Sequence, residues 1–497
     1  MNVAVAASPS SKGDAVGNTH ARRALDCGGM YRGIIARFSH AADNVLRRMT
    51  PPQKIEGSWG IDPVPVRLRI LGGLDTGLLW GNLGVSLLVI VAGAALVPAL
   101  SLPDALVAIL VGCLVGNLML AVAGAIGADA RVPGMALMRA PLGQRGSYLP
   151  TGINVLQGIG WSVFELLIIA TAAAALSEEL FGFRVQWLWT LVFGAFALIL
   201  SMLGPIGFVR RFVRRFAVWA VPLALGYLTW WAVDGADLGA LWDAPGEGGI
   251  SVWQGADIVV AITVSWIPYA ADYTRFSRTR RGAFWGTGLG YLVPDAWLLA
   301  LGVVLVLSRD LGDPAALPAA VVAGGFAAIV ALFALLVTET DEAFANVYSA
   351  AVSLQNIVPQ APQKLLLVLV TATATAGALV IDLVSYQSFL LLLGSVFVPL
   401  FAVLLADWLS VGRHYAYADV FGTPAWRPGL IAAWLVGFAL YQWLYPTGPS
   451  WWVDVVARLD PPGWGIGATV PSFLISFGVA SAVAHFSRRA VALGAGT

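Results

Sequence analysis

Residues 326–359 read FAAIVALFALLVTETDEAFANVYSAAVSLQNIVP, an apolar stretch of membrane-spanning length that is interrupted by the acidic run TETDE at 338–342. Apolar residues dominate before this run and return after Asn346. A charge inside a membrane costs roughly 2.5–3.5 kcal/mol on insertion scales, so it normally faces a water-filled cavity or a bound partner. The stretch therefore predicts a helix that holds a cation or a polar solute. The alternative is that the helix ends near Thr338 and that water surrounds the acids in a loop.

The composition predicts an integral membrane protein. Hydrophobic residues make up 58% of the chain and charged residues only 11%, and the mean hydropathy is +0.79. A soluble domain carries about 25% charged residues. The net charge of +1 gives no reason to expect a nucleic-acid partner. Two cysteines, Cys27 and Cys113, cannot build a disulfide framework. The polar N-terminal segment lacks the apolar core of a secretory signal, so no cleaved signal peptide is expected.

Apolar runs of spanning length, on the order of 17–25 residues, recur along the chain. They lie at 71–97, 103–126, 149–176, 187–208, 216–233, 254–271, 284–307, 326–357, 365–384, 389–409, 429–445 and 468–486. These runs are too long for strands and do not alternate with the period of two that a membrane barrel would need. The sequence therefore predicts an all-α membrane protein of about twelve transmembrane helices.

Basic residues indicate how these helices are oriented. Arginine or lysine follows every even-numbered span, for example at Arg131, Arg275, Lys364 and Arg488, whereas the odd-numbered exits are poorer in basic residues. Because cytoplasmic loops carry the excess of basic residues, both termini are predicted to be cytoplasmic. We expect a multi-pass protein of the inner (plasma) membrane.

Two of the predicted helices contain residues that interrupt a helix near the middle of the membrane. The first holds WGNLGVS at 80–86 and the sixth holds TVSWIP at 263–268. Unwound backbone and half-helix ends bind ions and polar solutes in transporters. The alternative is ordinary helix packing, in which glycine allows close approach and serine bonds to the backbone. Because the two interruptions lie five helices apart, at corresponding places of a five-plus-five repeat, the pattern favours a binding site.

The third predicted helix carries Gln157, Trp161 and Glu165 at steps of four, which places them on one helical face. An indole can stack on a flat, nitrogen-rich ring while a carboxylate accepts the N–H groups at its edge. The alternative for Trp161 is a lipid-facing or interfacial residue. Glu165 lies mid-helix, so it must be protonated, paired or functional.

Short motifs occur in a fixed order from about Ile55 to the last helix. They are IEGSWGIDPVP at 55–65, Gly160-Trp161, Ser265-Trp266, DYTR at 272–275, NVYS at 346–349 with Gln355-Asn356, GSVFVPL at 394–400 and ADW at 406–408. In order and placement they resemble the nucleobase:cation symporter-1 family, the group of purine–cytosine permeases and hydantoin transporters.

The resemblance implies a leucine-transporter type of fold, with a five-plus-five inverted repeat and two additional C-terminal helices. On this basis the chain divides into a cytoplasmic tail at 1–54, repeats at 55–233 and 254–409, and the extra helices at 410–497. A transporter of this kind is not an enzyme and needs no cofactor beyond a coupling ion, Na⁺ or H⁺. We expect it to act as a monomer.

The resemblance also implies a site for a planar heterocycle between two aromatic side chains. Carried over by position, the expected substrate-binding residues are Ser86, Gln157, Trp161, Glu165, Ser265, Trp266 and Asn346. The expected cation site comprises Asn82, Val85, Thr340 and Asp341. Asp272 and Arg275 form either part of an inner gate or a local surface pair.

Two positions depart from the family pattern. Glu165 stands where a glutamine or asparagine is usual, and Thr340-Asp341 stands where two hydroxyl residues are usual. A carboxylate at Glu165 favours a ring rich in N–H donors, such as an aminopyrimidine, over one dense in carbonyls. Asp341 fits either a stronger sodium site or the titrating group of a proton-coupled carrier.

The sequence thus predicts secondary active import of a nucleobase or related aminopyrimidine, of the cytosine, purine or hydroxymethylpyrimidine type, by symport with Na⁺ or H⁺. One alternative is a carrier for another small solute, such as an amino acid or allantoin or hydantoin. Another is a Mg²⁺-dependent intramembrane transferase, for which the sequence lacks a second acidic cluster. The sequence contains no His/Cys set that would hold a metal.

Overall fold

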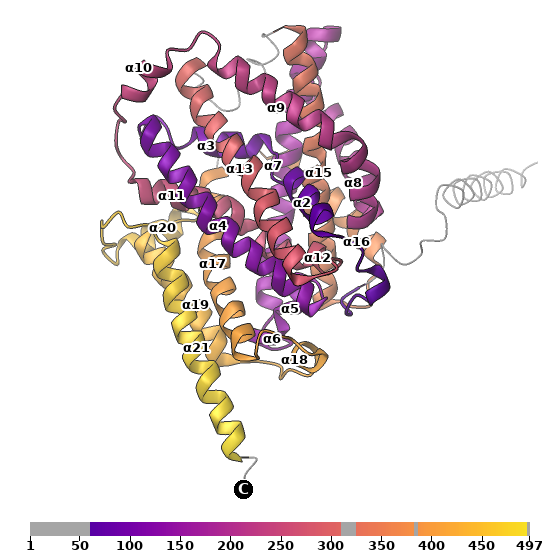
Figure 1. The fold of residues 1–497 in the computed structure, drawn as a ribbon, viewed down its shortest axis with the longest axis vertical. Helices are drawn as coiled ribbons and strands as arrows, with labels where there is room; N and C mark the ends of the chain where they lie inside the picture. The colour runs from indigo at the N-terminus through magenta and orange to yellow at the C-terminus, as the bar shows by residue number, and fades with distance from the viewer. Residues whose placement is uncertain (1–59, 310–324, 382–385, 495–497) are drawn as a thin grey trace, which may run out of the picture. The chain divides into compact units, whose positions relative to one another are not determined.

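The computed structural model describes residues 60–309, 325–381 and 386–494 (Figure 1). The predicted tail at 1–54 and the first residues of the motif at 55–65 lie outside these ranges. Within them the chain is helical, and its one strand-like feature is an isolated bridge between Leu71 and Ser277. The predicted all-α fold is confirmed.

The first predicted span is a broken helix. It consists of α2 (Gly73–Leu83) and α3 (Leu87–Ala94), which meet at an angle of 60°. Gly84 ends α2, where a Cβ atom would lie 2.8 Å from the ring of Pro294. The hydroxyl of Ser86 then caps α3 by accepting the Leu88 N–H at 3.0 Å. The glycine and serine that predicted the break are therefore the residues that produce it.

The sixth predicted span is broken as well, as expected. It consists of α11 (Val252–Ser265) and α12 (Ile267–Thr274), with Trp266 between them. Pro268 occupies the first turn of α12, where a missing N–H costs no helical hydrogen bond. Both predicted interruptions are thus present: the first helix bends at its break, and the sixth is divided into two helices at Trp266.

The acidic run at 338–342 does not end its helix. Helix α15 (Phe326–Ile357) continues through it, and the side chains of Glu339, Thr340, Asp341 and Glu342 are buried. The alternative of a water-exposed loop is therefore wrong. Helix α15 packs against α7 (Tyr148–Phe181), α8 (Gln186–Phe208), α9 (Val218–Val233) and α16 (Gln363–Ala378).

The remaining helices complete the fold around these elements. The long ones are α4 (Leu102–Ala130), α13 (Arg280–Arg309), α17 (Tyr386–Ser410), α19 (Pro428–Leu444) and α21 (Thr469–Gly494). The short ones are η1 (Val66–Leu68), α5 (Gly134–Leu137), α6 (Arg139–Leu142), the π-helix η2 (Val209–Ala217), α10 (Leu238–Asp243), α18 (Tyr417–Phe421) and α20 (Ser450–Ala457). Each of the twelve predicted spans coincides with a helix or a broken pair.

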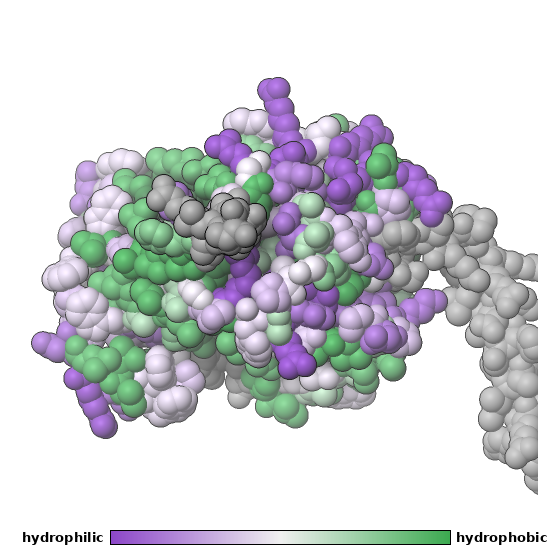
Figure 2. All heavy atoms as spheres, turned by 90° about the horizontal axis from the view of Figure 1, so that it is seen from below, coloured by the Kyte–Doolittle hydropathy of each residue, from purple (hydrophilic) through white to green (hydrophobic). Residues whose placement is uncertain are grey.

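Seven of the described helices are long and apolar enough to cross a membrane, or eight if the α2–α3 pair counts as one span. Helices α16 and α19 are apolar but shorter. On α4, exposed apolar side chains recur at steps of three and four, at Val107, Leu110, Leu114 and Leu118. Figure 2 shows a broad hydrophobic area beside hydrophilic residues on one face. Exposed apolar stripes of this kind face lipid, so the protein is a multi-pass membrane protein.

The helices pack in two groups that meet at the breaks. Helix α13 packs against α2, α3 and α4, and α11 and α12 pack against α4. Helices α7, α8, α15 and α16 pack against one another. We call these the α4–α13 group and the α7–α15 group. Helix α17 packs on α11, and α19 and α21 lie beside it (Figure 1).

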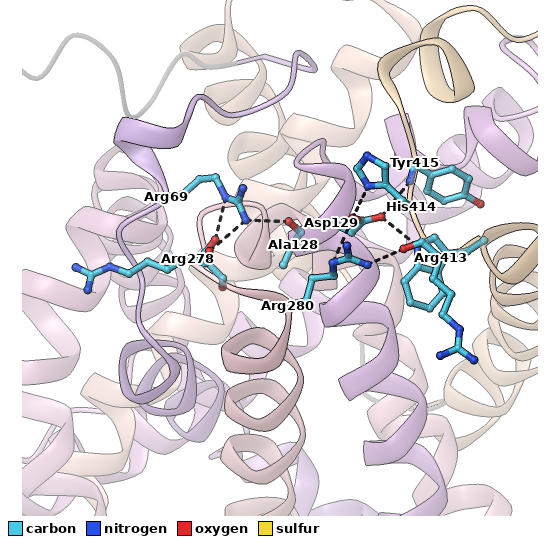
Figure 3. A network of polar contacts seen from close by, with 10 residues as sticks. Arg69, Ala128, Asp129, Arg278, Arg280, Arg413, His414 and Tyr415 are labelled. Atoms are coloured by element: carbon cyan, nitrogen blue, oxygen red, sulfur yellow. Dashed lines mark hydrogen bonds and ion pairs between the residues drawn. The ribbon is translucent and has the colours of Figure 1, made fainter. Parts of the chain in front are cut away.

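A polar network ties the end of α4 to the loop after α17 (Figure 3). The buried Asp129 carboxylate accepts hydrogen bonds from the indole of Trp408 at 3.1 Å and the Tyr415 N–H at 3.0 Å. The same carboxylate lies 2.9 Å from Nδ1 of His414 and 3.4 Å from Nε of Arg280. One aspartate therefore joins α4, the start of α13 and the segment that follows α17.

Candidate substrate and cation site

A cavity lies where the two broken helices face α7 and α15. Of the seven predicted substrate-binding residues, six line it: Ser86, Trp161, Glu165, Ser265, Trp266 and Asn346. They come from the start of α3, from α7, from the α11–α12 break and from α15. The fold thus assembles residues that are up to 260 positions apart in the sequence, from Ser86 to Asn346.

The cavity is narrow in this conformation. The cavity volume is only about 10 Å³. That volume corresponds to about one water molecule. A six-membered ring therefore enters only when the walls move apart.

Aromatic side chains form the walls, and they are almost fully buried. Trp161 is 7% exposed and packs edge-on against Phe389 at 5.6 Å between ring centroids. The reading of Trp161 as a lipid-facing residue is therefore wrong. Trp266 packs at 5.9 Å against both Trp80 and Tyr269. Trp80 stands in the predicted WGNLGVS segment, but its role as a support for Trp266 was not foreseen.

Gln157 lies one turn before Trp161, and its side-chain amide forms a hydrogen bond with the backbone at the α11–α12 break. Its Nε2 donates to the Ser265 carbonyl at 2.7 Å and to Oδ1 of Asn154 at 3.3 Å. The Ser265 hydroxyl donates to the Ile262 carbonyl at 2.6 Å. Gln157 is absent from the cavity lining, so in this conformation it ties α7 to the unwound backbone.

Glu339, for which the sequence suggested no role, caps the second half of the broken helix. Its carboxylate accepts the Ser86 hydroxyl at 2.8 Å and the Leu87 N–H at 2.8 and 3.0 Å. An anion at a helix N-terminus is stabilised by the unpaired N–H groups and by the helix dipole. All of these contacts use Glu339 as an acceptor, which is the behaviour of an ionised carboxylate.

Glu165 meets Glu339 and Glu342 in the interior, across the interface between α7 and α15. All three side chains are buried, and Glu165 lies close enough to Glu339 and Glu342 to interact with both electrostatically. None of the ion pairs found among the described residues involves this cluster. The cluster is therefore an acidic centre whose charge only a proton or a bound cation can balance.

The four residues of the predicted cation site are all buried, and the side chains of two of them are in contact. The side-chain amide of Asn82 on α2 donates to Oδ2 of Asp341 on α15. Thr340 donates its hydroxyl to the Leu336 carbonyl at 3.1 Å within α15, and the Val85 N–H donates to the Asn82 carbonyl at 3.2 Å. In the described ranges no group of three or more His, Cys, Asp or Glu side chains is arranged to hold a metal ion. The Mg²⁺-dependent transferase therefore gains no support.

Asp272 and Arg275 are fully buried, so the reading of a local surface pair is wrong. Arg275 donates to the Gly60 carbonyl at 2.9 Å and to the Tyr348 hydroxyl at 3.1 Å. Asp272 accepts the Gly134 N–H at 2.9 Å. The two residues thus connect α12 to the segment before α2, to α15 and to α5.

Comparisons with known proteins agree with this architecture. The family described as permeases for cytosine/purines, uracil, thiamine and allantoin matches residues 63–467. A hydantoin permease of Microbacterium maritypicum is 24% identical over 395 residues, which cover 73% of this chain and 78% of that protein.

Solved structures share the fold at low sequence identity. Mhp1, a nucleobase-cation-symport-1 family transporter solved in a closed conformation with bromovinylhydantoin bound, has a TM-score of 0.69 at 18% identity and covers 87% of this chain and 96% of its own. A manganese transporter of Eremococcus coleocola has a TM-score of 0.54 at 13% identity, with coverages of 88% and 99%.

The predicted leucine-transporter type of fold is therefore confirmed, and the chain is a transporter and not an enzyme. The match to the permease family covers well over half of the chain. The chain belongs to the nucleobase:cation symporter-1 family.

Proposed function

We propose that this protein imports a planar heterocycle rich in N–H donors, a nucleobase or aminopyrimidine of the cytosine, purine or hydroxymethylpyrimidine type. The observation that carries the proposal is one cavity lined by Trp161, Trp266, Glu165 and Asn346. Two indoles offer faces for stacking, while a carboxyl and an amide offer edges for hydrogen bonds. None of the described residues that line the cavity is basic, so its chemistry suits a neutral ring that presents donors.

A monovalent cation would drive import, and the acidic cluster favours a proton. Among the described residues no basic side chain forms an ion pair with Glu165, Glu339 or Glu342, and a proton would neutralise these acids without further ligands. The alternative ion, Na⁺, requires several oxygen ligands, and at the predicted cation site the Asn82 amide nitrogen already donates to Asp341. Substrate and ion would raise each other's affinity by the same factor.

Alternating access would come from movement of the α4–α13 group against the α7–α15 group around this cavity. We further propose the division into repeats at 55–233 and 254–409 and extra helices at 410–497. The basic exits of the even-numbered spans support cytoplasmic termini in the plasma membrane. A single chain contains every element of the site, which supports action as a monomer.

Hydantoin is the second candidate substrate. The relative from Microbacterium maritypicum is named a hydantoin permease, and the Mhp1 structure holds a hydantoin derivative. A hydantoin ring is planar but denser in carbonyls than an aminopyrimidine. Glu165, standing where the family more often has an amide, favours the aminopyrimidine, because a carboxylate accepts hydrogen bonds and does not donate them.

The test is uptake of radiolabelled cytosine, adenine, hydroxymethylpyrimidine and hydantoin by cells that express the full chain. Uptake is measured at several pH values, with Na⁺ present or replaced by choline. We expect saturable uptake of a donor-rich ring that rises as the external pH falls and does not require Na⁺. Uptake of hydantoin alone would overturn the substrate proposal, and an absolute need for Na⁺ would overturn the choice of ion.

Variants connect the uptake to the cavity. Trp161→Ala and Glu165→Ala should abolish uptake while the protein stays in the membrane. The matched controls are Trp219→Ala, since Trp219 is 71% exposed on α9, and Glu178→Ala, since Glu178 lies exposed near the end of α7. Both controls should transport normally. Uptake equal to that of the parent protein in either cavity variant would contradict the assignment of the site.

A further inference from the structure

Asp295 is a buried aspartate that neither the cavity nor the predicted cation site uses. It stands on α13 and is fully buried. Its Oδ2 accepts three hydrogen bonds: from Asn117 Nδ2 at 3.2 Å, from the Thr263 hydroxyl at 3.1 Å and from the Cys113 thiol at 3.6 Å. Three neutral donors on α4 and α11 thus converge on one oxygen of this carboxyl group.

Oδ1, the other oxygen of the Asp295 carboxyl group, lacks such donors in the part of the chain that the structure describes. Among the described residues, Oδ1 of Asp295 has no hydrogen-bond partner, and neither has the buried Oδ1 of the contacting Asn117. None of the ion pairs in these ranges includes Asp295. A buried carboxylate with one bare oxygen and no cation is costly. Protonation at Oδ1 removes the buried charge, and Oδ2 then acts as the carbonyl acceptor of all three hydrogen bonds.

We propose that Asp295 is a second proton-binding site of this carrier, built by Cys113, Asn117 and Thr263 and separate from the substrate cavity. The existence of this proton site does not depend on the proposed function, but its role in transport does. Proton binding is a simple addition: Oδ1 takes H⁺ from the solvent during one phase of the cycle and returns it in another. No metal is implied, because a thiol and an amide nitrogen take up two of the positions around the carboxyl group.

The position of Asp295 links this site to the substrate. Asp295 lies one helical turn after Tyr291, which lines the cavity, and Thr263 lies two residues before Ser265. Asp295 and its three partners all belong to the α4–α13 group, so they move together. Glu342, on α15 of the other group, is close enough to interact with Asp295 electrostatically. Charge on Asp295 therefore opposes the close approach of the two groups, and a proton on Asp295 permits it.

The titratable groups around Asp295 are few. Cys113 faces it from α4, Tyr291 precedes it on α13, and Glu342 faces it from α15. Of the other helices packed on α13, α3 has no titratable side chain, α2 has Asp75 at its first turn, and α9 has Tyr227, whose ring lies against Trp230. Asp295 itself is therefore the acid whose proton this site holds.

The first test needs no substrate. Infrared spectra of the full-length protein in lipid should contain a C=O stretch of a protonated carboxylic acid that Asp295→Asn lacks. Asp407→Asn is the matched control, because buried Asp407 forms an ion pair with Arg427 at 2.8 Å and accepts the Tyr415 hydroxyl at 2.9 Å. That variant should retain the band. An unchanged spectrum in Asp295→Asn would overturn the proposal.

A second variant keeps the proposal testable if Asp295→Asn does not fold. Thr263→Val removes one donor from the carbonyl oxygen, so the C=O band should move to higher wavenumber. A band that stays in place would show that the acid is another residue. The cavity acids Glu165 and Glu342 cannot mimic this result, because neither accepts a hydrogen bond from Thr263.

The second test measures coupling in proteoliposomes with a one-unit pH gradient, using whichever ring the uptake panel identifies. Each coupled proton contributes about 1.4 kcal/mol per pH unit, or a factor of ten in accumulation. Asp295→Asn should therefore lower steady-state accumulation about tenfold while substrate exchange without a gradient continues. Equal accumulation in variant and parent would overturn the link to transport. If none of the rings in the uptake panel is transported, only the proposed function is overturned. The infrared test still shows whether Asp295 binds a proton.

Discussion

Replacing Glu339 with glutamine is expected to loosen the closed conformation. Glu339 on α15 holds Ser86 and the Leu87 N–H at the start of α3, so its carboxylate joins the two helix groups directly. Glutamine keeps one oxygen for the Leu87 N–H but loses the charge. The contact would therefore persist as a weaker, neutral hydrogen bond.

The free-energy cost of the substitution has two parts: a weaker hydrogen bond and the loss of an anion at the N-terminus of α3. Hydrogen bonds to a charged group contribute roughly 1.5–3 kcal/mol, against about 1 kcal/mol for neutral ones. An anion at a helix N-terminus adds about 0.3–1 kcal/mol, and up to ~2 when partly buried. Together the substitution should cost about 2–3 kcal/mol, which shifts the equilibrium toward open conformations by roughly 30- to 150-fold.

The assay is the rate at which a maleimide alkylates a cysteine placed at Val89, which lines the cavity, in protein that carries Cys27→Ser. Cys113 is buried and gives a low background. The rate should rise with Glu339→Gln by about the calculated factor. Glu178→Gln is the control, because its exposed pair with Arg184 lies away from the cavity and should leave the rate unchanged. Equal rates in Glu339→Gln and its parent would refute the capping role.

Three further predictions use stability and affinity measurements. A Cβ atom on Gly93 would collide with the Leu299 carbonyl, so Gly93→Ala should lower the melting temperature through overpacking of about 1–3 kcal/mol, whereas Gly226→Ala, in open space, should not. Asp129→Ala leaves the buried Trp408 indole N–H without its acceptor and should destabilise the protein by about 1–3 kcal/mol in denaturant titrations; an unchanged midpoint would contradict the network in Figure 3. Gln157→Leu should weaken substrate affinity about tenfold by releasing the unwound backbone, and unaltered affinity in binding assays would count against it.

The breaks in the first and sixth spans could be predicted because their causes are local. Glycine and serine in 80–86 and proline at 268 act on the backbone within a few residues, and the structure breaks both helices there. Helical periodicity placed Trp161 and Glu165 on one face of their helix, whereas the role of Asn346 beside them came only from the resemblance to the family. Local rules thus predicted the helices and which of their faces are polar.

The partners of the buried acids could not be predicted, because they come from distant parts of the chain. Glu339 contacts Ser86 across 253 positions, and no spacing within α15 shows which of its acids meets α3. The same limit applied to Arg275, whose partners Gly60 and Tyr348 lie on two other segments. For Asp295 a signal existed: it is a single carboxyl in an otherwise apolar span, which is a reason to expect function.

The narrowness of the cavity has a consequence for how the carrier chooses its cargo. Because the walls approach to leave only about 10 Å³, a ring is selected while the site closes and not merely when it enters. A compound that stacks on Trp161 but carries a bulky substituent would bind and then hold the walls apart. Such a compound would act as an inhibitor, so the boundary between cargo and inhibitor is set by the thickness and outline of the molecule.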